Sequence, residues 1–198
     1  MSNDGGVDTS RRRFLTVATV AVGGAGAAFG AYPFIAAMQP SARAEAAGAP
    51  VEIDIGKLEP GARLTVEWRG KPVWVVRRTP EMLSKLDSIA GELRDPNSDQ
   101  DQQPGYAKNT YRSIKPEYLV LIGLCTHLGC SPTYRPEPGA SDLGSNWPGG
   151  FFCPCHGSRF DLAGRGFAGV PAPLNMPVPP HRFAGDSRIV IGDDKGAA

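Results

Sequence analysis

Residues 125–130 read CTHLGC, and residues 153–158 read CPCHGS. These two boxes contain all four cysteines and two of the three histidines of the 198-residue chain. Thiolate and imidazole groups at such short spacing can hold one metal centre between two opposing loops, and Gly129 and Gly157 let the backbone turn tightly beneath it. The boxes therefore predict a metal centre whose ligands come from two loops.

Two other arrangements would use the same residues. A structural zinc ion in a Cys2His2 site would take two of the cysteines and both histidines. Two disulfide bonds would use all four cysteines and leave the histidines without a role. Four cysteines in 198 residues are too few for a disulfide scaffold, so their placement matters more than their number. On the residues alone, all three interpretations remain open.

The composition describes a loop-rich folded protein. Apolar residues make up 41% and charged residues 21% of the chain, which is typical of about one domain with an appendage. The 25 glycines and 19 prolines indicate many loops. The net charge of +1 argues against a nucleic-acid-binding protein, because such proteins carry a clustered basic excess.

Around the boxes, the pattern of apolar residues predicts an all-β head. The apolar run at residues 118–124 leads directly into the first box, and residues 63–68 match residues 73–77 as a hairpin across a turn at 69–72. Further strands are expected at residues 51–55 and 188–191.

Residues 79–93 predict one amphipathic helix in this head. Thr79 is a typical N-cap, Pro80 stands at the first helical position, and apolar residues recur at helical spacing from Met82 onward. The polar residues 95–115 that follow predict an exposed loop.

The N-terminus carries a membrane-spanning pattern. Residues 14–38 form a run of 25 residues without a charge. Such a helix is about 37 Å long, enough for a hydrocarbon core of about 30 Å. The three arginines at residues 11–13 place the N-terminus in the cytoplasm and the rest of the chain outside it. We expect a retained anchor; a signal peptide cleaved at Ala-Arg-Ala (residues 42–44) and a buried core helix are the alternatives.

Residues 10–15, Ser-Arg-Arg-Arg-Phe-Leu, resemble the twin-arginine export signal, which is read by a receptor and serves proteins that cross the membrane already folded. That route suggests a cofactor inserted before export. Residues 39–50 follow as an alanine-rich linker that can be helical or extended. A change between the two states would displace the following residues by about 20 Å, so we expect a flexible hinge, with a passive tether as the alternative.

The two boxes resemble those of the Rieske iron–sulfur proteins, C-T-H-L-G-C and C-P-C-H-G-S, at every position. The resemblance implies one 2Fe-2S cluster in which two histidines replace two cysteines on one iron. It implies a Rieske fold, all-β, with an antiparallel sheet base domain, an inserted rubredoxin-like cluster-binding subdomain and one short helix, plus one N-terminal transmembrane helix. The implied domains are a cytoplasmic twin-arginine signal region (1–13), a transmembrane anchor (14–38), a flexible hinge (39–50) and a periplasmic Rieske head (51–198) with cluster-binding loops at about 125–174.

The resemblance also assigns the ligands of the cluster. Cys125 and Cys153 would bind the inner iron, and His127 and His156 would bind the outer iron. Imidazole is a neutral ligand, so the cluster would carry less negative charge and have a higher potential than one held by four thiolates.

Three further residues of the boxes receive roles from the resemblance. Cys130 and Cys155 would form a disulfide that clamps the two loops together, which a periplasmic location permits. The Ser158 hydroxyl would donate a hydrogen bond to the cluster and raise its potential.

Two positions depart from the family pattern. At the position of Phe160, respiratory relatives often have a tyrosine, and the tyrosine hydroxyl donates a hydrogen bond to a ligand sulfur. Because Phe160 has no hydroxyl, we expect the cluster of this chain to have a lower reduction potential. The family's G-P-A-P loop reads Val-Pro-Ala-Pro at residues 170–173, which keeps a cover for the cluster but leaves the backbone angles at Val170 open. His181 lies outside the boxes, and we expect it to be a surface or packing residue.

The resemblance is closest to the Rieske subunits of cytochrome bc1 complexes, and the 22 residues at 131–152 suggest a bacterial branch. It implies an electron-transfer subunit of a respiratory ubiquinol–cytochrome c reductase, which is an oxidoreductase and translocase. The cluster would accept an electron from ubiquinol bound in cytochrome b, with His156 as the hydrogen-bond partner of the quinol oxygen. The head would pass the electron to cytochrome c1, contributing to proton translocation.

This interpretation implies a single-pass protein of the inner membrane within a dimeric complex, and no nucleic-acid partner. The small Rieske subunit of arsenite oxidase and a structural zinc module are the alternatives.

Overall fold

The computed structural model describes residues 8–197, and the chain divides into two compact units between Ala46 and Ala47. Residues 1–7 of the expected signal region lie outside the described residues. The helices are α1 (Thr9–Ala37), α2 (Ala42–Ala47), α3 (Pro80–Ser84) and the 3-10 helices η1 (Ala90–Glu92) and η2 (Gly105–Ala107). The strands are β1 (Val51–Asp54), β2 (Arg63–Trp68), β3 (Lys71–Arg77), β4 (Tyr118–Ile122), β5 (Thr133–Arg135), β6 (Gly150–Phe152), β7 (Arg159–Phe160), β8 (His181–Phe183) and β9 (Arg188–Ile191).

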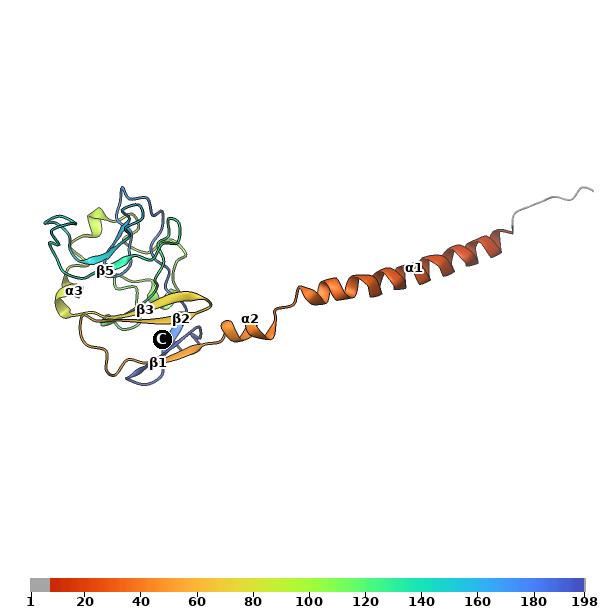
Figure 1. Ribbon diagram of the computed structural model, residues 1–198, viewed down its shortest axis with the longest axis horizontal. Helices are drawn as coiled ribbons and strands as arrows, with labels where there is room; N and C mark the ends of the chain where they lie inside the picture. Colours follow the sequence, from red (N-terminus) through yellow and green to blue (C-terminus); the bar gives the residue numbers. More distant parts are fainter. Residues whose placement is uncertain (1–7, 198) are drawn as a thin grey trace, which may run out of the picture. The chain divides into compact units, whose positions relative to one another are not determined.

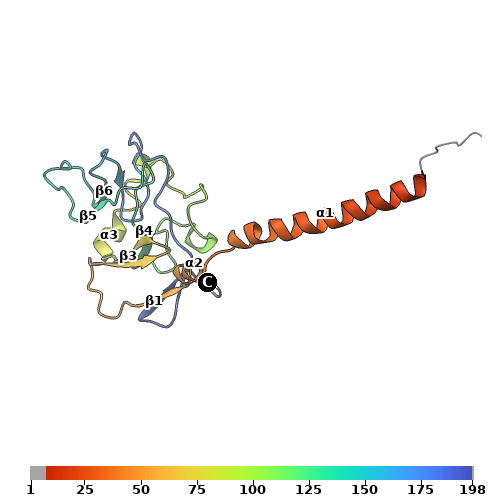
Figure 2. The ribbon, with the colours of Figure 1, turned by 45° about the vertical axis from the view of Figure 1, so that its right-hand side comes forward.

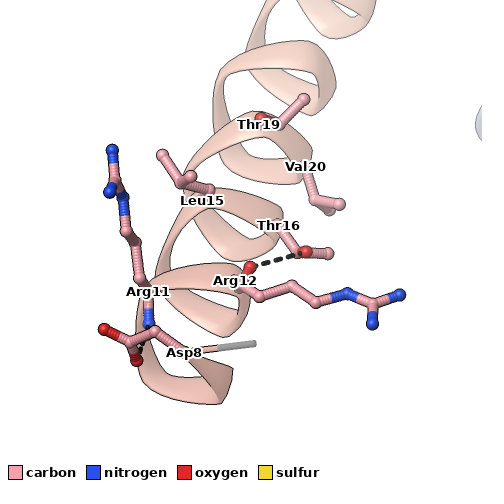
Figure 3. Close-up of a pocket in the computed structure, with 7 residues that line it drawn as sticks. All are labelled: Asp8, Arg11, Arg12, Leu15, Thr16, Thr19 and Val20. Atoms are coloured by element: carbon pink, nitrogen blue, oxygen red, sulfur yellow. Dashed lines mark hydrogen bonds between the residues drawn. The ribbon is translucent and has the colours of Figure 1, made fainter. Parts of the chain in front are cut away.

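The N-terminal unit consists mainly of α1. Asp8 caps its first turn, because the Asp8 carboxylate accepts hydrogen bonds from the backbone N–H groups of Ser10 and Arg11, both at 3.1 Å. Figure 3 shows this end of the helix, with the side chains of Arg11 and Arg12 pointing to different sides. None of the residues of α1 is buried, and the helix is long and apolar enough to cross a membrane. The expected N-terminal helix is therefore confirmed, while the anchor and hinge boundaries stay predictions.

The head is built from three antiparallel sheets of three strands each, in the orders β1-β9-β8, β2-β3-β4 and β5-β6-β7. In Figures 1 and 2 the β2-β3-β4 sheet lies between β1 on one side and β5 on the other. The all-β class is thus confirmed, and each strand expected from the sequence is present. The hairpin joining β2 and β3 turns more tightly than expected, since Trp68 pairs with Lys71.

The middle sheet is buried on both faces. Along β3, Val73 and Val75 pack toward the β1-β9-β8 sheet, while Trp74 and Val76 pack toward the β5-β6-β7 sheet. Because side chains alternate between the faces of a strand, one continuous apolar strand supplies both cores. The core between the middle sheet and the β5-β6-β7 sheet contains Cys125 and Cys153. The first cysteine of each box therefore packs in the core next to the middle sheet.

The helix expected at residues 79–93 is shorter than its apolar spacing indicates. Thr79 caps it and Pro80 begins it as expected, but α3 ends at Ser84. The buried Leu86 belongs to a turn instead, and the buried Leu93 forms an isolated antiparallel bridge with Phe167. A helix could not continue to residue 93, because residues 92–94 use their backbone groups to form hydrogen bonds with residues 166–168.

The expectation that residues 95–115 form an exposed loop is wrong for part of the segment. Ser98, Ala107 and Arg112 are fully buried, and Ser113 nearly so. Partners in the interior compensate the burial of most of these polar groups: the Arg112 guanidinium donates to the carbonyl of Met176 at 2.8 Å, and the Ser113 hydroxyl accepts from Arg78 at 2.8 Å. The Ser98 hydroxyl and the Arg112 Nε atom have no partner among the described residues.

Candidate metal centre

The two boxes fold into the same turn. In each box the N–H of the first residue donates to the carbonyl of the sixth, from Cys125 to Cys130 at 2.7 Å and from Cys153 to Ser158 at 2.8 Å. The N–H of the fifth residue donates back to the carbonyl of the first at 2.9 Å in both boxes. That fifth residue is a glycine with a φ angle of 79° in one box and 77° in the other, in the left-handed region that favours glycine.

Strands hold both turns in place. The first box follows β4 of the middle sheet, and the second box is the turn between the paired strands β6 and β7. The sheet order therefore brings together two segments whose first cysteines are 28 residues apart in the chain.

The turns bring together two thiols and two imidazoles. Cys125 and Cys153 are free and buried, with exposed fractions of 3% and 2%. The rings of His127 and His156 lie edge to face, with centroids 4.8 Å apart. The Nδ1 atom of His127 is buried and has no hydrogen-bond partner among the described residues. Nε2 of His181 is also buried without a partner, so the missing bond alone does not mark a ligand. Nδ1 of His127 fits that role because its box also supplies a free thiol and its ring faces the imidazole of the other box.

The two remaining cysteines form the expected disulfide. Cys130 and Cys155 are bonded, with their Cα atoms 6.7 Å apart. The bond joins the end of the first turn to the middle of the second, so it clamps the two loops. Cys125 and Cys153 stay free, so the alternative in which all four cysteines form two disulfides is wrong.

The environment of Cys153 favours the protonated thiol. Burial raises the pKa of the Cys153 thiol, and the neighbouring Cys125 raises it further. Desolvation disfavours the charged thiolate, so a metal that binds this sulfur would have to displace its proton.

The proline loop (residues 170–173) is tied to both boxes. The Ser158 hydroxyl in the second box accepts a hydrogen bond from the backbone N–H of Ala172 at 3.1 Å. Thr126 in the first box donates to the carbonyl of Leu174 at 2.6 Å. Ala172 is fully buried in the same core as Cys125, so the loop covers the boxes as expected.

The backbone at Val170 needs no glycine. The left-handed residue of this segment is Gly169, with a φ angle of 76°, and Val170 is not among the positive-φ residues of the described chain. The valine therefore fits without backbone strain.

Two residues outside the boxes have clear packing roles. Phe160 is fully buried in the core that contains the two free cysteines, and it brings no hydroxyl there. His181 is also fully buried, so the packing alternative holds and the surface alternative is wrong. Its Nδ1 atom lies 2.9 Å from the carbonyl of Pro179, and burial lowers its pKa.

Four buried charges behind the second box went unnoticed in the sequence. Arg165 donates to the Asp161 carboxylate at 2.8 Å. Arg78 and Arg112 donate to backbone carbonyls of residues 162–164, the shortest of these bonds being 3.0 Å. The turn after the second box is thus held by three guanidinium groups. The only local signal was the i, i+4 spacing of Asp161 and Arg165.

The surface around the boxes is exposed and partly apolar. Leu128, between His127 and Gly129, has an exposed fraction of 71% and is the one exposed large apolar side chain in the described part of the head. His156 is exposed and lines a hollow of about 650 Å³ together with Arg159 and residues 167–171. The tip of the head therefore presents an imidazole beside an apolar contact point.

Comparisons with known proteins agree with this geometry. Residues 51–180 match the family described as "Rieske [2Fe-2S] domain", and residues 1–41 match "Ubiquitinol-cytochrome C reductase Fe-S subunit TAT signal". A relative from Allochromatium vinosum, named ubiquinol-cytochrome c reductase iron-sulfur subunit, is 64% identical over 98% of this chain and 93% of its own length. A relative of the same name from Blastochloris viridis is 43% identical over 97% of this chain and 98% of its own. A solved structure titled "Hyperthermophilic respiratory Complex III" is 25% identical, covers 87% of this chain and 98% of its own, and has a TM-score of 0.48.

Two matching turns that present two thiols and two imidazoles, clamped by a disulfide on an all-β head, define a Rieske-type iron–sulfur protein. The Rieske match covers residues 51–180 and includes both boxes. The chain belongs to the family of ubiquinol–cytochrome c reductase iron–sulfur subunits.

The residues present fit a Rieske-type 2Fe-2S cluster. Two buried free thiols, two facing imidazoles and one buried, unpartnered ring nitrogen make up its mixed donor set. A zinc ion would use the same four side chains, but the family match favours the iron–sulfur cluster.

Proposed function

We propose that this chain is the electron-transfer subunit of a ubiquinol–cytochrome c reductase, carrying electrons from ubiquinol at cytochrome b to cytochrome c1. The observation that carries the proposal is the 64% identity over 98% of the chain to a subunit of that name. The relatives leave the arsenite oxidase alternative without support. The bound cluster supplies one-electron redox chemistry; the chain's own residues bind it, orient it and expose it to partners.

In this proposal the ligands are Cys125 and Cys153 on the inner iron and His127 and His156 on the outer iron. The burial of the two thiols supports cysteine ligands on the inner iron, and the exposure of His156 supports histidine ligands on the outer iron. Ligation through Nδ1 of His127 accounts for the missing hydrogen-bond partner of that buried atom. The Ser158 hydroxyl accepts from Ala172, so its own proton is free to donate to a cluster sulfur.

His156 is the proposed contact for the quinol. Its imidazole is exposed, whereas that of His127 is half-buried. If one ring nitrogen of His156 binds the metal, the other carries the proton of the neutral ring. A bound cation makes that proton easier to lose, and the deprotonated nitrogen would then accept the hydrogen bond of a quinol hydroxyl and take up its proton. Leu128 beside it supplies an apolar contact for docking on a membrane-embedded partner.

The proposed setting is the inner membrane, with α1 as a single-pass anchor, the N-terminus in the cytoplasm and the head in the periplasm. The twin-arginine match over residues 1–41 and the charge-free run that follows Arg13 support it. Residues 39–50 would act as the hinge between cytochrome b and cytochrome c1, within a dimeric complex. The helix α2 inside this segment offers a helix-to-coil change that would lengthen it.

Purification of the full chain from its native membranes in mild detergent tests the proposal. We expect b-type and c-type cytochromes to co-purify, and the reduced sample to show the electron paramagnetic resonance spectrum of a Rieske cluster. A colourless zinc-containing protein, or a complex with a molybdenum subunit and no b-type cytochrome, would contradict it.

The docking surface has its own test. Leu128→Asp should lower the rate of quinol-dependent cytochrome c reduction by about tenfold or more, because burial of a leucine is worth about 1.5–3 kcal/mol. Ser187→Asp adds the same charge at an exposed position away from the boxes and should leave the rate unchanged. Equal rates in both variants would remove Leu128 from the proposed interface.

A further inference from the structure

Residues 92–95, between η1 and the loop that follows, run beside the segment that connects the second box to the proline loop. We call these four residues the brace. They pair antiparallel with residues 166–168: the Arg94 N–H donates to the Gly166 carbonyl at 2.9 Å, and a second backbone bond of 2.8 Å closes the other end. Backbone hydrogen bonds therefore hold the brace in place independently of its side chains.

The side chain of Arg94 reaches from the brace to the proline loop. Its Nη2 atom donates to the carbonyl of Val170, the first residue of that loop, at 3.2 Å. The boxes hold the same loop further along, through Ser158 and Thr126. Arg94 differs from these two anchors because it comes from outside the boxes.

The next residue of the brace acts on the other end of the loop. The Asp95 carbonyl accepts a hydrogen bond from the Asn175 side-chain amide at 3.0 Å, and the Asn175 oxygen accepts from the Gly166 N–H at 2.9 Å. Asn175 is buried, so this end is anchored in the interior. Consecutive brace residues thus hold the entry of the proline loop, which is its first residue, and Asn175, which lies just beyond its last residue.

The entry is the end at which the loop can open. Val170 is half-buried and lines the hollow beside His156, whereas Ala172 is fully buried. Displacement of Val170 would widen this hollow and admit water toward the boxes. The Arg94 hydrogen bond opposes that displacement, and it does so at an exposed site where the guanidinium stays hydrated.

We propose that Arg94 is a positioning residue: by holding the Val170 carbonyl, it keeps the proline loop closed over the cluster and slows loss of the cluster. The inference rests on the cluster site proposed above. It predicts that the Arg94 side chain controls how long the cluster is retained without controlling the stability of the fold, because the backbone of the brace stays paired.

The test uses the full chain with its cluster, in detergent, and compares wild type with Arg94→Met, Arg94→Lys and Arg159→Met. Methionine keeps an aliphatic stem but has no donor, whereas lysine keeps a donor. Arg159 is an exposed arginine that lines the same hollow and makes no described side-chain hydrogen bond to the loop. Cluster loss to an added iron chelator is followed by the visible circular dichroism of the cluster, below the unfolding temperature, and the fold is followed by far-ultraviolet circular dichroism.

Arg94→Met should lose its cluster about fivefold faster than wild type, the factor that corresponds to one hydrogen bond of about 1 kcal/mol. Arg94→Lys should restore most of the difference, and Arg159→Met should match wild type. The unfolding midpoint of the fold in Arg94→Met should fall by no more than about 4 °C, the shift that corresponds to about 1 kcal/mol.

Equal rates of cluster loss in Arg94→Met and wild type would overturn the inference. A faster loss that is accompanied by a fall of more than about 4 °C in the unfolding midpoint, or that Arg159→Met reproduces, would also overturn it. A wild-type chain without the spectrum of a cluster contradicts the proposed function and this inference together, whereas equal rates in proteins that carry the cluster contradict the inference alone.

Discussion

The disulfide clamp permits a quantitative prediction. Replacing Cys130 and Cys155 together with serine removes a bond that spans a sequence separation of 25 residues. Loop-closure entropy for a loop of that length corresponds to about 3.5 kcal/mol at 25 °C. In chains of 150–250 residues, about 1 kcal/mol shifts an unfolding midpoint by about 2–4 °C, so we expect a decrease of about 7–14 °C. Both cysteines are replaced because Cys153 lies within 4.8 Å of both clamp sulfurs, and a lone remaining thiol could exchange with it.

The unfolding midpoint is measured by far-ultraviolet circular dichroism, with all samples heated at one rate. Wild-type protein treated with a reductant that opens the disulfide is the control without a mutation, and it should lose as much stability as the double variant. A decrease of less than about 2 °C in both samples would show that the boxes are held by the sheets and the proline loop alone, and would refute the role of the clamp.

Three further predictions concern single residues. Phe160→Tyr should raise the midpoint potential of the cluster in a redox titration by roughly 40 mV, the value of one hydrogen bond of about 1 kcal/mol for a one-electron couple; an unchanged midpoint refutes the explanation for the missing hydroxyl. Asp161→Ala should lower the free energy of unfolding in urea by roughly 3–5 kcal/mol, because the buried Arg165 guanidinium loses its partner, and a loss below about 1 kcal/mol contradicts this. Burial lowers the pKa of His181 in the folded state, so the unfolded state binds more protons as the pH falls below about 6.5 and stability is lost there. His181→Gln should therefore show a smaller stability difference between about pH 7.5 and about pH 5.5 than wild type, and an equal difference would assign the effect to other groups.

The parts of the fold that were predictable are those encoded by neighbouring residues. The strand β3 alternates between two cores, with Val73 and Val75 on one face and Trp74 on the other, and its pattern is visible in the sequence. The boxes were predictable for the same reason, since each turn is closed by hydrogen bonds within six residues. The ligand roles within the boxes came from the family resemblance and stay predictions.

The parts that were not predictable depend on distant partners. Leu86 and Leu93 have the spacing of a helix, yet α3 ends at Ser84 and residues 92–94 pair with residues 166–168. Arg112 lies in a polar stretch that indicates exposure, yet it is fully buried with a φ angle of 49°. Its burial requires carbonyl acceptors from residues 163–176, and no local pattern specifies those.

The two boxes share one backbone turn but place different side chains on it. Histidine is the third residue of the first box and the fourth of the second, and this offset of one position leaves His127 half-buried and His156 exposed. The sixth position holds Cys130 in the first box and Ser158 in the second. Cys130 forms the disulfide, whereas Ser158 accepts a hydrogen bond from the proline loop. A centre with one shielded and one accessible imidazole follows from that asymmetry. In the proposed function, the accessible imidazole of His156 is the one that can meet a partner, while the half-buried His127 stays beside the core.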